Sequence, residues 1–107
     1  MPSKLHLKAN PTLADYQQYM RDMMVERGFS DSITSKFMLL VEEIGELAKA
    51  ARKQAGMKFA DDTRRTEVEE EAADVFIVFL GLCNLLEIDL EAAIRAKEER
   101  NKLREWK

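Results

Sequence analysis

Hydrophobic side chains recur every three or four residues along most of this chain, the spacing of one face of an α-helix. The pattern predicts four helices, at about residues 12–27, 31–54, 66–86 and 89–104. No stretch shows the strict alternation of a half-buried strand, and no repeat or low-complexity segment interrupts the pattern. The expected fold is therefore all-α, with four helices in a bundle-like arrangement.

Helix starts and stops are marked by residues that satisfy free backbone groups. Asn10 followed by Pro11 predicts the start of the first helix, since Asn is a good N-cap and Pro suits the first turn. Ser30 or Asp31 is expected to cap the second helix. Three further signals complete the set: a capping box of Thr66 with Glu69, the cap Asp89, and the closing glycines Gly28 and Gly56.

The apolar faces predict how these helices pack. The run 75–86 is apolar almost all round, so the third helix is expected to be the central and most buried one. The expected core face of the second helix consists of Phe37, Leu40, Ile44, Leu47, Ala48 and Ala51. A length of 107 residues suits one core, so residues 1–107 are expected to form a single helical domain.

Composition narrows the class of partner. The net charge of −3 and the lack of a dense basic stripe argue against nucleic-acid binding. The apolar run is too short to cross a membrane, and no signal peptide is visible, so we expect a cytoplasmic protein. Cys83, the one cysteine, lies in that apolar run and is expected to be a buried, reduced thiol.

Two acidic clusters interrupt the apolar helices. Glu42, Glu43 and Glu46 lie in the second helix, and Glu71 and Asp74 lie in the third. Residues three or four apart share a helix face, so each cluster places carboxylates one turn above another. Converging carboxylates repel unless a cation lies between them, and oxygen ligands favour Mg²⁺, with Mn²⁺ as a substitute. The sequence thus predicts a metal site between two helices.

These charges have other interpretations. Runs of Glu are usually solvated helix faces, and this is the simpler interpretation for Glu67, Glu69, Glu70 and Glu42 taken alone. Buried salt bridges are a second way to compensate these negative charges, but the nearest basic residues follow the first cluster by about one turn or more. His6 is the only histidine, which excludes a His-rich metal site and a di-iron bundle.

The carboxyl-terminal segment carries a second candidate pattern. Lys97, Asn101 and Arg104 recur on one helical face and would suit the phosphates of a ligand. Taken alone, the pattern is more typical of a solvated helix end. Gly45, between two acidic residues, would let a helix or a ligand approach closely.

Together, these motifs resemble a known family. Glu-Glu-Ile-Gly-Glu at 42–46 and Glu-Ala-Ala-Asp at 71–74 resemble the E-E-x-x-E…E-x-x-D signature of MazG-type nucleotide pyrophosphohydrolases. The basic pattern after residue 96 is also similar, and the resemblance extends over about residues 37–104. Glu105 and Trp106 stand where many relatives have an aromatic-proline pair.

The resemblance implies a fold, an assembly and a reaction. Such proteins are all-α NTP pyrophosphatases that form homodimers or homotetramers and convert a nucleoside triphosphate to the monophosphate and pyrophosphate, often in nucleotide-pool house-cleaning. It implies that Glu43, Glu46, Glu71 and Asp74 hold Mg²⁺, that Glu42 is an outer or auxiliary carboxylate, and that Lys97, Asn101 and Arg104 contact phosphates. The reaction also needs a general base to orient the attacking water, and Glu46 and Glu42 are the candidates for it. The base is expected to meet the first helix and the 56–65 connection, with Tyr16, Tyr19, Phe37 and Phe59 as stacking candidates or core residues.

Three functional hypotheses follow from these observations. The preferred one is hydrolysis of an NTP or dNTP. A phosphoribosyl-ATP pyrophosphohydrolase is an enzyme of the same chemistry with another substrate. A helical regulatory protein that binds nucleotide or metal without turnover belongs to a different class, and it predicts no release of pyrophosphate.

Overall fold

The computed structural model describes the backbone of residues 2–56 and 62–104, and the side chains of 2–56 and 66–104. It contains four helices: α1 (Leu13–Arg27), α2 (Ile33–Ala55), α3 (Asp62–Leu85) and α4 (Leu90–Lys102). No strand occurs within the described ranges, which confirms the all-α prediction. None of the helices found there is long and apolar enough to cross a membrane.

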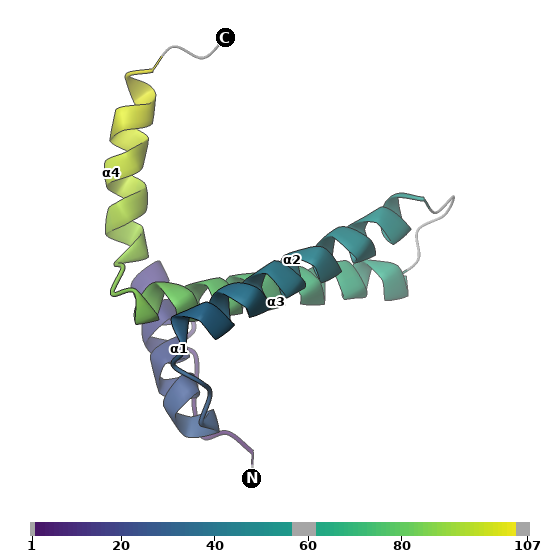
Figure 1. Cartoon of the computed structure of the whole chain (residues 1–107), viewed down its shortest axis with the longest axis horizontal. Helices are drawn as coiled ribbons and strands as arrows, with labels where there is room; N and C mark the ends of the chain where they lie inside the picture. The colour runs from purple at the N-terminus through teal and green to yellow at the C-terminus, as the bar shows by residue number, and fades with distance from the viewer. Residues whose placement is uncertain (1, 57–61, 105–107) are drawn as a thin grey trace.

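The helices form an open arrangement rather than a closed globule. Helices α2 and α3 lie side by side and antiparallel, while α1 crosses α3 near one end of the pair and α4 packs on α1 (Figure 1). The radius of gyration is 16.6 Å, whereas a compact domain of this length has about 13 Å. One chain therefore leaves much of the α2–α3 pair exposed.

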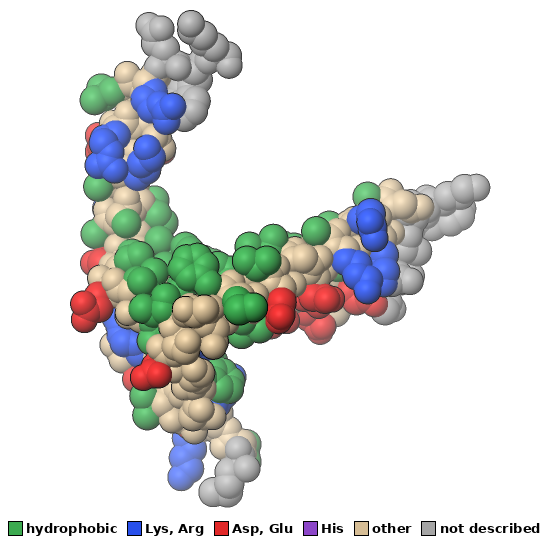
Figure 2. Space-filling model, in the orientation of Figure 1, with side chains coloured by type: hydrophobic (Ala, Val, Ile, Leu, Met, Phe, Trp, Pro, Cys, Tyr) green, Lys and Arg blue, Asp and Glu red, His purple; other side chains and the backbone are tan. Residues whose placement is uncertain are grey.

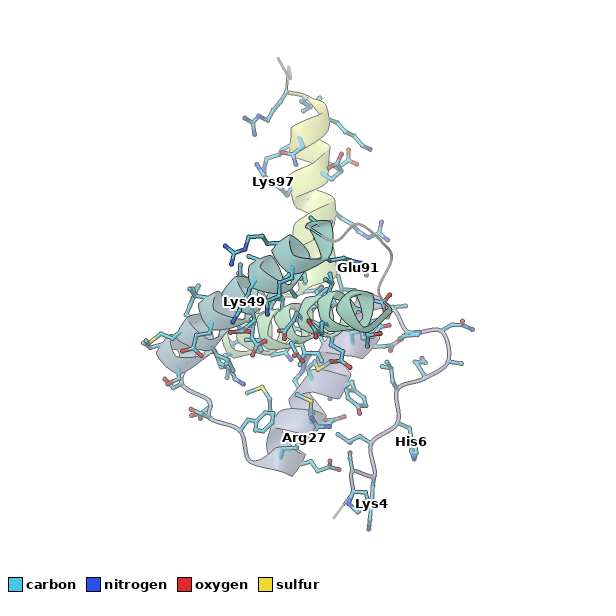
Figure 3. All side chains as sticks on the ribbon, turned by 90° about the vertical axis from the view of Figure 1, so that its right-hand side faces the viewer. Lys4, His6, Arg27, Lys49, Glu91 and Lys97 are labelled. Atoms are coloured by element: carbon cyan, nitrogen blue, oxygen red, sulfur yellow. The ribbon has the colours of Figure 1, made fainter. Side chains whose placement is uncertain are left out.

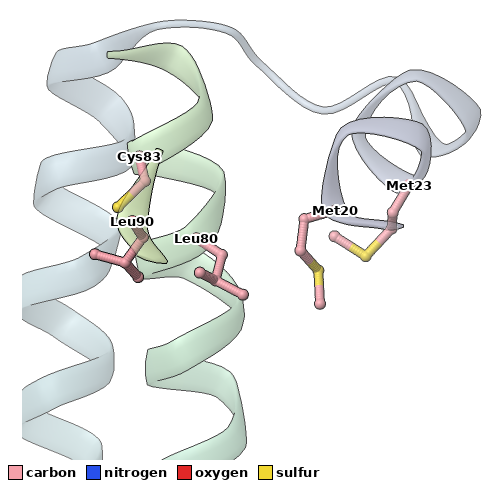
Figure 4. Packing of buried hydrophobic residues seen from close by; sticks show 5 residues of the cluster. All are labelled: Met20, Met23, Leu80, Cys83 and Leu90. Atoms are coloured by element: carbon pink, nitrogen blue, oxygen red, sulfur yellow. The ribbon is translucent and has the colours of Figure 1, made fainter. Parts of the chain in front are cut away.

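The core lies where three helices meet. Met20 and Met23 of α1 cluster with Leu80 and Cys83 of α3 and with Leu90 at the start of α4 (Figure 4). Leu80 is fully buried and Cys83 nearly so, which confirms the predicted central position of the third helix and the buried thiol. Burial also raises the pKa of the Cys83 thiol, because the thiolate would lose its hydration.

A buried glutamine fixes the α3–α4 turn to α1. Gln17 Nε2 donates to Asn84 Oδ1 at 2.9 Å and to the Ile88 carbonyl at 2.8 Å, and Gln17 Oε1 accepts from the Leu90 N–H at 3.0 Å. Asn84 Nδ2 in turn donates to the Gln17 carbonyl at 2.9 Å. These bonds satisfy groups that would be costly to bury unpaired. The sequence pattern did not single out Gln17 or Asn84.

Several predicted helix starts were wrong. The N-cap of α1 is Thr12, not Asn10, because Thr12 and Asp15 form a capping box. The Asp15 N–H donates to Thr12 Oγ1 at 3.2 Å, and the Thr12 N–H donates to Asp15 Oδ2 at 2.8 Å. The latter bond, from the Thr12 backbone, is the main cause of the lowered pKa of the Asp15 carboxyl. Ser32, rather than Ser30 or Asp31, caps α2.

The other helix ends agree with the prediction or differ from it by at most about one turn. Asp89 caps α4 by accepting from the Ala92 N–H at 3.1 Å, as predicted. Gly28 closes α1 with a φ of 65°, a conformation that favours glycine. Helix α3 begins at Asp62, one turn before the start predicted at Thr66, and α4 ends at Lys102 rather than near Arg104.

The core face predicted for α2 was partly wrong. Leu40 and Leu47 are half-buried, as expected, but Phe37, Ile44, Ala48 and Ala51 are exposed. The buried residues of α2 are Lys36 and Ala50, so the face that packs on α3 is rotated from the face expected on hydrophobicity alone. The physical reason is that α2 has two apolar faces, and a single chain covers only one of them.

Candidate metal centre between helices α2 and α3

Three of the predicted metal ligands meet between the paired helices. Carboxylate oxygens of Glu43, Glu71 and Asp74 all lie within 4.8 Å of one another. Glu43 and Glu71 are half-buried and Asp74 is exposed, so the cluster lies at the edge of the α2–α3 contact and is open to ligands from one side. Figure 2 shows acidic side chains gathered along one edge of the arm that these helices form.

The local structure explains why these residues meet. Glu43 follows the half-buried Leu40 by three residues and precedes the half-buried Leu47 by four, which places it on the face that packs on α3. Glu71 and Asp74 are three residues apart, so both carboxylates project from one side of α3. Antiparallel packing then brings the middle of α2 beside the first half of α3.

The cluster is electrostatically unfavourable as it stands. Loss of hydration on burial raises the pKa of the Glu43 carboxyl, and the negative charges of Asp74, Glu71, Glu46 and Glu42 raise it further. In the described part of the chain, no Lys or Arg forms an ion pair with Glu43, Glu71 or Asp74. The salt-bridge alternative therefore finds no support there.

These observations fit a metal ion. Oxygen-only donors of high negative charge at this spacing are the ligands that hard divalent cations take. A cation held between the three carboxylates would relieve the repulsion that raises the pKa of Glu43. The cluster thus has the donor set and the spacing to hold a metal ion.

Glu42 and Glu46 lie beside the cluster rather than in it. Both are exposed, and neither shares the 4.8 Å grouping of the other three carboxylates. Both are near enough for their charges to act on Glu43. Their positions leave them free to contact a ligand that covers the open side of the cluster.

The predicted phosphate-binding residues lie on another helix. Lys97 and Asn101 are on α4, and Arg104 follows its end. Helix α4 extends away from the α2–α3 pair (Figure 1), and Lys97 lies near its middle (Figure 3). Within one chain, the structure does not bring these three residues to the acidic cluster.

The four aromatic stacking candidates are scattered. Tyr16 and Tyr19 pack against the core cluster, and the ring of Tyr16 meets that of Phe76 edge-on with centroids 6.5 Å apart. Phe37 is exposed on α2. Phe59 lies outside the described residues, as does most of the 56–65 connection expected to meet the base. None of Tyr16, Tyr19 and Phe37 lines any of the three main pockets between the described residues.

Comparison with known proteins gives the family. Residues 12–101 match the family model of phosphoribosyl-ATP pyrophosphohydrolase. The matched segment spans most of the chain and includes both acidic clusters and nearly all of the four helices. A comparison with curated proteins finds none that matches.

The match supports part of the resemblance noted from the motifs. It supports an all-α pyrophosphohydrolase type, whose members hydrolyse a phosphoanhydride bond, but it does not single out the MazG type. Helical fold, converging carboxylates and family match agree with one another. The chain belongs to the phosphoribosyl-ATP pyrophosphohydrolase family.

Proposed function

We propose that this protein is a Mg²⁺-dependent pyrophosphohydrolase that cleaves the triphosphate chain of a nucleotide and releases pyrophosphate. The observation that carries the proposal is the convergence of Glu43, Glu71 and Asp74 without a compensating cation among the described residues. A structural role would favour pairing or separating such charges, whereas a site for a metal and a polyphosphate needs them together.

Phosphoryl transfer depends mainly on positioning and on neutralising charge. In this proposal Glu43, Glu71 and Asp74 hold Mg²⁺, and the nearby Glu46 extends the ligand set. A metal ion held by these residues would neutralise phosphate charge and make a water molecule more acidic. Glu42 or Glu46, both exposed beside the cluster, orients the attacking water and accepts its proton.

The first candidate substrate is phosphoribosyl-ATP. The family match favours it over a simple NTP, which reverses the order of preference reached from the motifs. An NTP or dNTP remains the second candidate, because Glu-Glu-Ile-Gly-Glu at 42–46 and Glu-Ala-Ala-Asp at 71–74 resemble the MazG-type signature. Both substrates present the same triphosphate to the acidic cluster, so the reaction is common to the two and only the recognised nucleoside differs.

Pyrophosphate release tests the reaction and ranks the substrates. We expect phosphoribosyl-ATP, or otherwise one group within a panel of standard and modified NTPs and dNTPs, to yield pyrophosphate and the matching monophosphate in equal amounts. The yield should require Mg²⁺ and vanish in EDTA. Release of orthophosphate instead would mean that a phosphoanhydride bond other than the one between the α and β phosphates is hydrolysed. No product from any substrate, with an intact helical fold, would favour a non-catalytic binding protein.

We also propose that the protein works as a homodimer, or as a tetramer built from dimers. Helix α2 carries a row of exposed apolar residues on the side away from the acidic cluster, including Met38 at 63% and Val41 at 66% exposure. Gly45 lies on the same side, and a Cβ there would meet nothing within 4 Å. Such a surface on an extended chain suits close packing against the helices of a second copy.

A second copy would also complete the site. Lys97, Asn101 and Arg104 lie on and after the outlying helix α4, away from their own acidic cluster. In a dimer, α4 of one protomer can approach the cluster of the other, and there the cations would neutralise phosphate charge. Under this proposal, phosphate binding by these residues depends on the assembly.

Val41→Glu is expected to separate the protomers. The change buries a charge in the proposed interface, at a cost of several kcal/mol, without touching the core of the chain. Light scattering coupled to size exclusion should show a dimer or tetramer for the wild type and a monomer for this variant. Val25→Glu is the matched control, since Val25 is 85% exposed on α1. A monomeric wild type would contradict the proposal.

A further inference from the structure

A pocket lies beside the acidic cluster, where α1 and the α1–α2 connection cover one end of the α2–α3 pair. Its volume is about 250 Å³. The walls are mostly apolar and come from three helices and the connection, with Met24, Phe29, Leu39, Ile77 and Val78 among them. This volume is below the roughly 300–1,000 Å³ of sites for drug-sized ligands, so the pocket suits a fragment the size of one heterocyclic base.

A lone cation lies in this apolar wall. Lys36 is only 8% exposed, and its ammonium lies 5.2 Å from the centre of the Phe29 ring. The Lys36 ammonium forms no hydrogen bond and no ion pair with the described residues. The ammonium carries three donors and has one aromatic neighbour, and its place in the pocket wall points to a ligand that brings an acceptor.

The pocket and the acidic cluster follow one another along the α2–α3 pair. On α2, Leu39 and Lys36 precede Glu43 by four and seven residues, about 6 and 10 Å along the helix axis. On the antiparallel α3, Val78 and Gly81 follow Asp74 by four and seven residues, toward the same end of the pair. All four residues line the pocket and lie one or two turns from the carboxylates on the same face of their helix.

We infer that this pocket binds the base of the nucleotide substrate and that Lys36 determines specificity by donating to a ring nitrogen or carbonyl oxygen of that base. This rests on the proposed function, since the triphosphate is taken to lie at the carboxylates. The apolar walls contact the flat faces of the base, and the ammonium donates a hydrogen bond to an acceptor on its edge. Because Lys only donates, the pocket favours a base that presents an acceptor over one that presents an amino group.

The pocket differs from the base site expected from the sequence. None of Tyr16, Tyr19 and Phe37 lines it. Met24 supplies the covering wall instead: its Sδ lies 3.5 Å from the position of a Cβ built at Gly81, so α1 approaches α3 closely there. The base would thus be held by methionine, phenylalanine and aliphatic side chains with one cation.

Binding of a non-hydrolysable nucleotide separates this inference from the proposed reaction. We would titrate wild type and Lys36→Met with the α,β-imido analogue of the best-ranked nucleotide in Mg²⁺, and with inorganic tripolyphosphate, by calorimetry. We expect Lys36→Met to weaken binding of the nucleotide analogue about 10- to 100-fold, as for loss of a charged hydrogen bond. Binding of tripolyphosphate, which has no base, should not change.

Two further variants sharpen the result. Leu39→Trp fills the pocket without touching Lys36 and should also weaken the analogue selectively, which keeps the test valid if Lys36→Met fails to fold. Lys53→Met is the matched control, an exposed lysine of the same helix, and should bind as wild type. Where turnover is measurable, Lys36→Met should also change the ranking of bases.

Each other outcome has a defined meaning. Unchanged binding of the analogue by Lys36→Met overturns the inference and leaves the reaction intact. Equal loss of the analogue and tripolyphosphate also overturns it, because Lys36 would then contact phosphate. A change in assembly mass without a selective loss would make the pocket a protomer interface, and it would overturn the inference as well. Selective loss in a protein that hydrolyses nothing would uphold the base pocket and reject the proposed reaction.

Discussion

Replacing Glu43 with Gln is expected to lower turnover by about 100- to 10,000-fold. The side chain keeps its size but loses its charge, one of the three negative charges of the acidic cluster. Under the proposed function, several kcal/mol of transition-state stabilisation would depend on a metal held there, and each 1.36 kcal/mol is a factor of ten in rate. Steady-state pyrophosphate release at saturating Mg²⁺ measures the effect.

The same substitution should stabilise the metal-free protein. Hydration lost on burial and the charges of Asp74 and Glu71 disfavour ionised Glu43, so a neutral Gln relieves a cost that the folded state bears. Thermal unfolding in EDTA should therefore give a higher Tm for Glu43→Gln than for wild type. A variant that loses both activity and stability would instead assign Glu43 to the structure of the protomer.

The control is a carboxylate of the same helix pair outside the cluster. Glu70 is exposed on α3 and lies one residue before Glu71. Glu70→Gln should leave both turnover and Tm close to those of wild type. A similar loss of activity in Glu70→Gln would mean that overall negative charge, rather than the three converging carboxylates, is what matters.

Removal of Mg²⁺ is expected to abolish turnover and to lower the Tm. A ligand that binds only the native state at 100 times its dissociation constant stabilises it by about 2.7 kcal/mol. For a domain of this size, that corresponds to a Tm shift of about 10 °C or more. Differential scanning calorimetry with Mg²⁺ and with EDTA measures the shift. Asp74→Asn removes one of the three carboxylates, so its shift should be much smaller.

The raised pKa of the Glu43 carboxyl makes both the stability of the metal-free protein and its affinity for Mg²⁺ depend on pH. In EDTA, the unfolded chain releases this proton near the ordinary value of 4.5, while the folded chain holds it to higher pH. The contribution of Glu43 to stability is thus fully present below 4.5 and is lost as pH rises through the raised pKa. The Tm in EDTA should fall over that interval, and it should not do so in Glu43→Gln.

The binding of Mg²⁺ should depend on pH in the opposite direction. Protons and the metal compete for Glu43, so the affinity for Mg²⁺ should increase as pH rises through the same interval and then level off. Titrations of Mg²⁺ by calorimetry at several pH values measure this. An affinity for Mg²⁺ that does not vary with pH in this interval would exclude Glu43 as a ligand.

The sequence determined the elements of this protein. Helical periodicity and local caps such as Asp89 and Gly28 are properties of neighbouring residues. The four helices of the described ranges, and the lack of a strand there, could therefore be predicted without knowing the packing. The two acidic clusters could be predicted for the same reason, since a spacing of three or four residues fixes a shared helix face. Errors at Asn10 and Thr66 were local, because several polar residues near each start can serve as caps.

Only the tertiary structure decided which faces meet. Helix α2 has two apolar faces, and hydrophobicity does not say which one packs on α3, so Phe37 and Ile44 were misplaced in the core. The orientation of α2 about its axis also places Glu43 near Glu71 and Asp74. It leaves Glu42 and Glu46 outside that grouping. It also buries Lys36 beside Phe29, which no local pattern indicates. Spacing along a helix fixes which residues share a face, whereas packing between helices decides what that face meets.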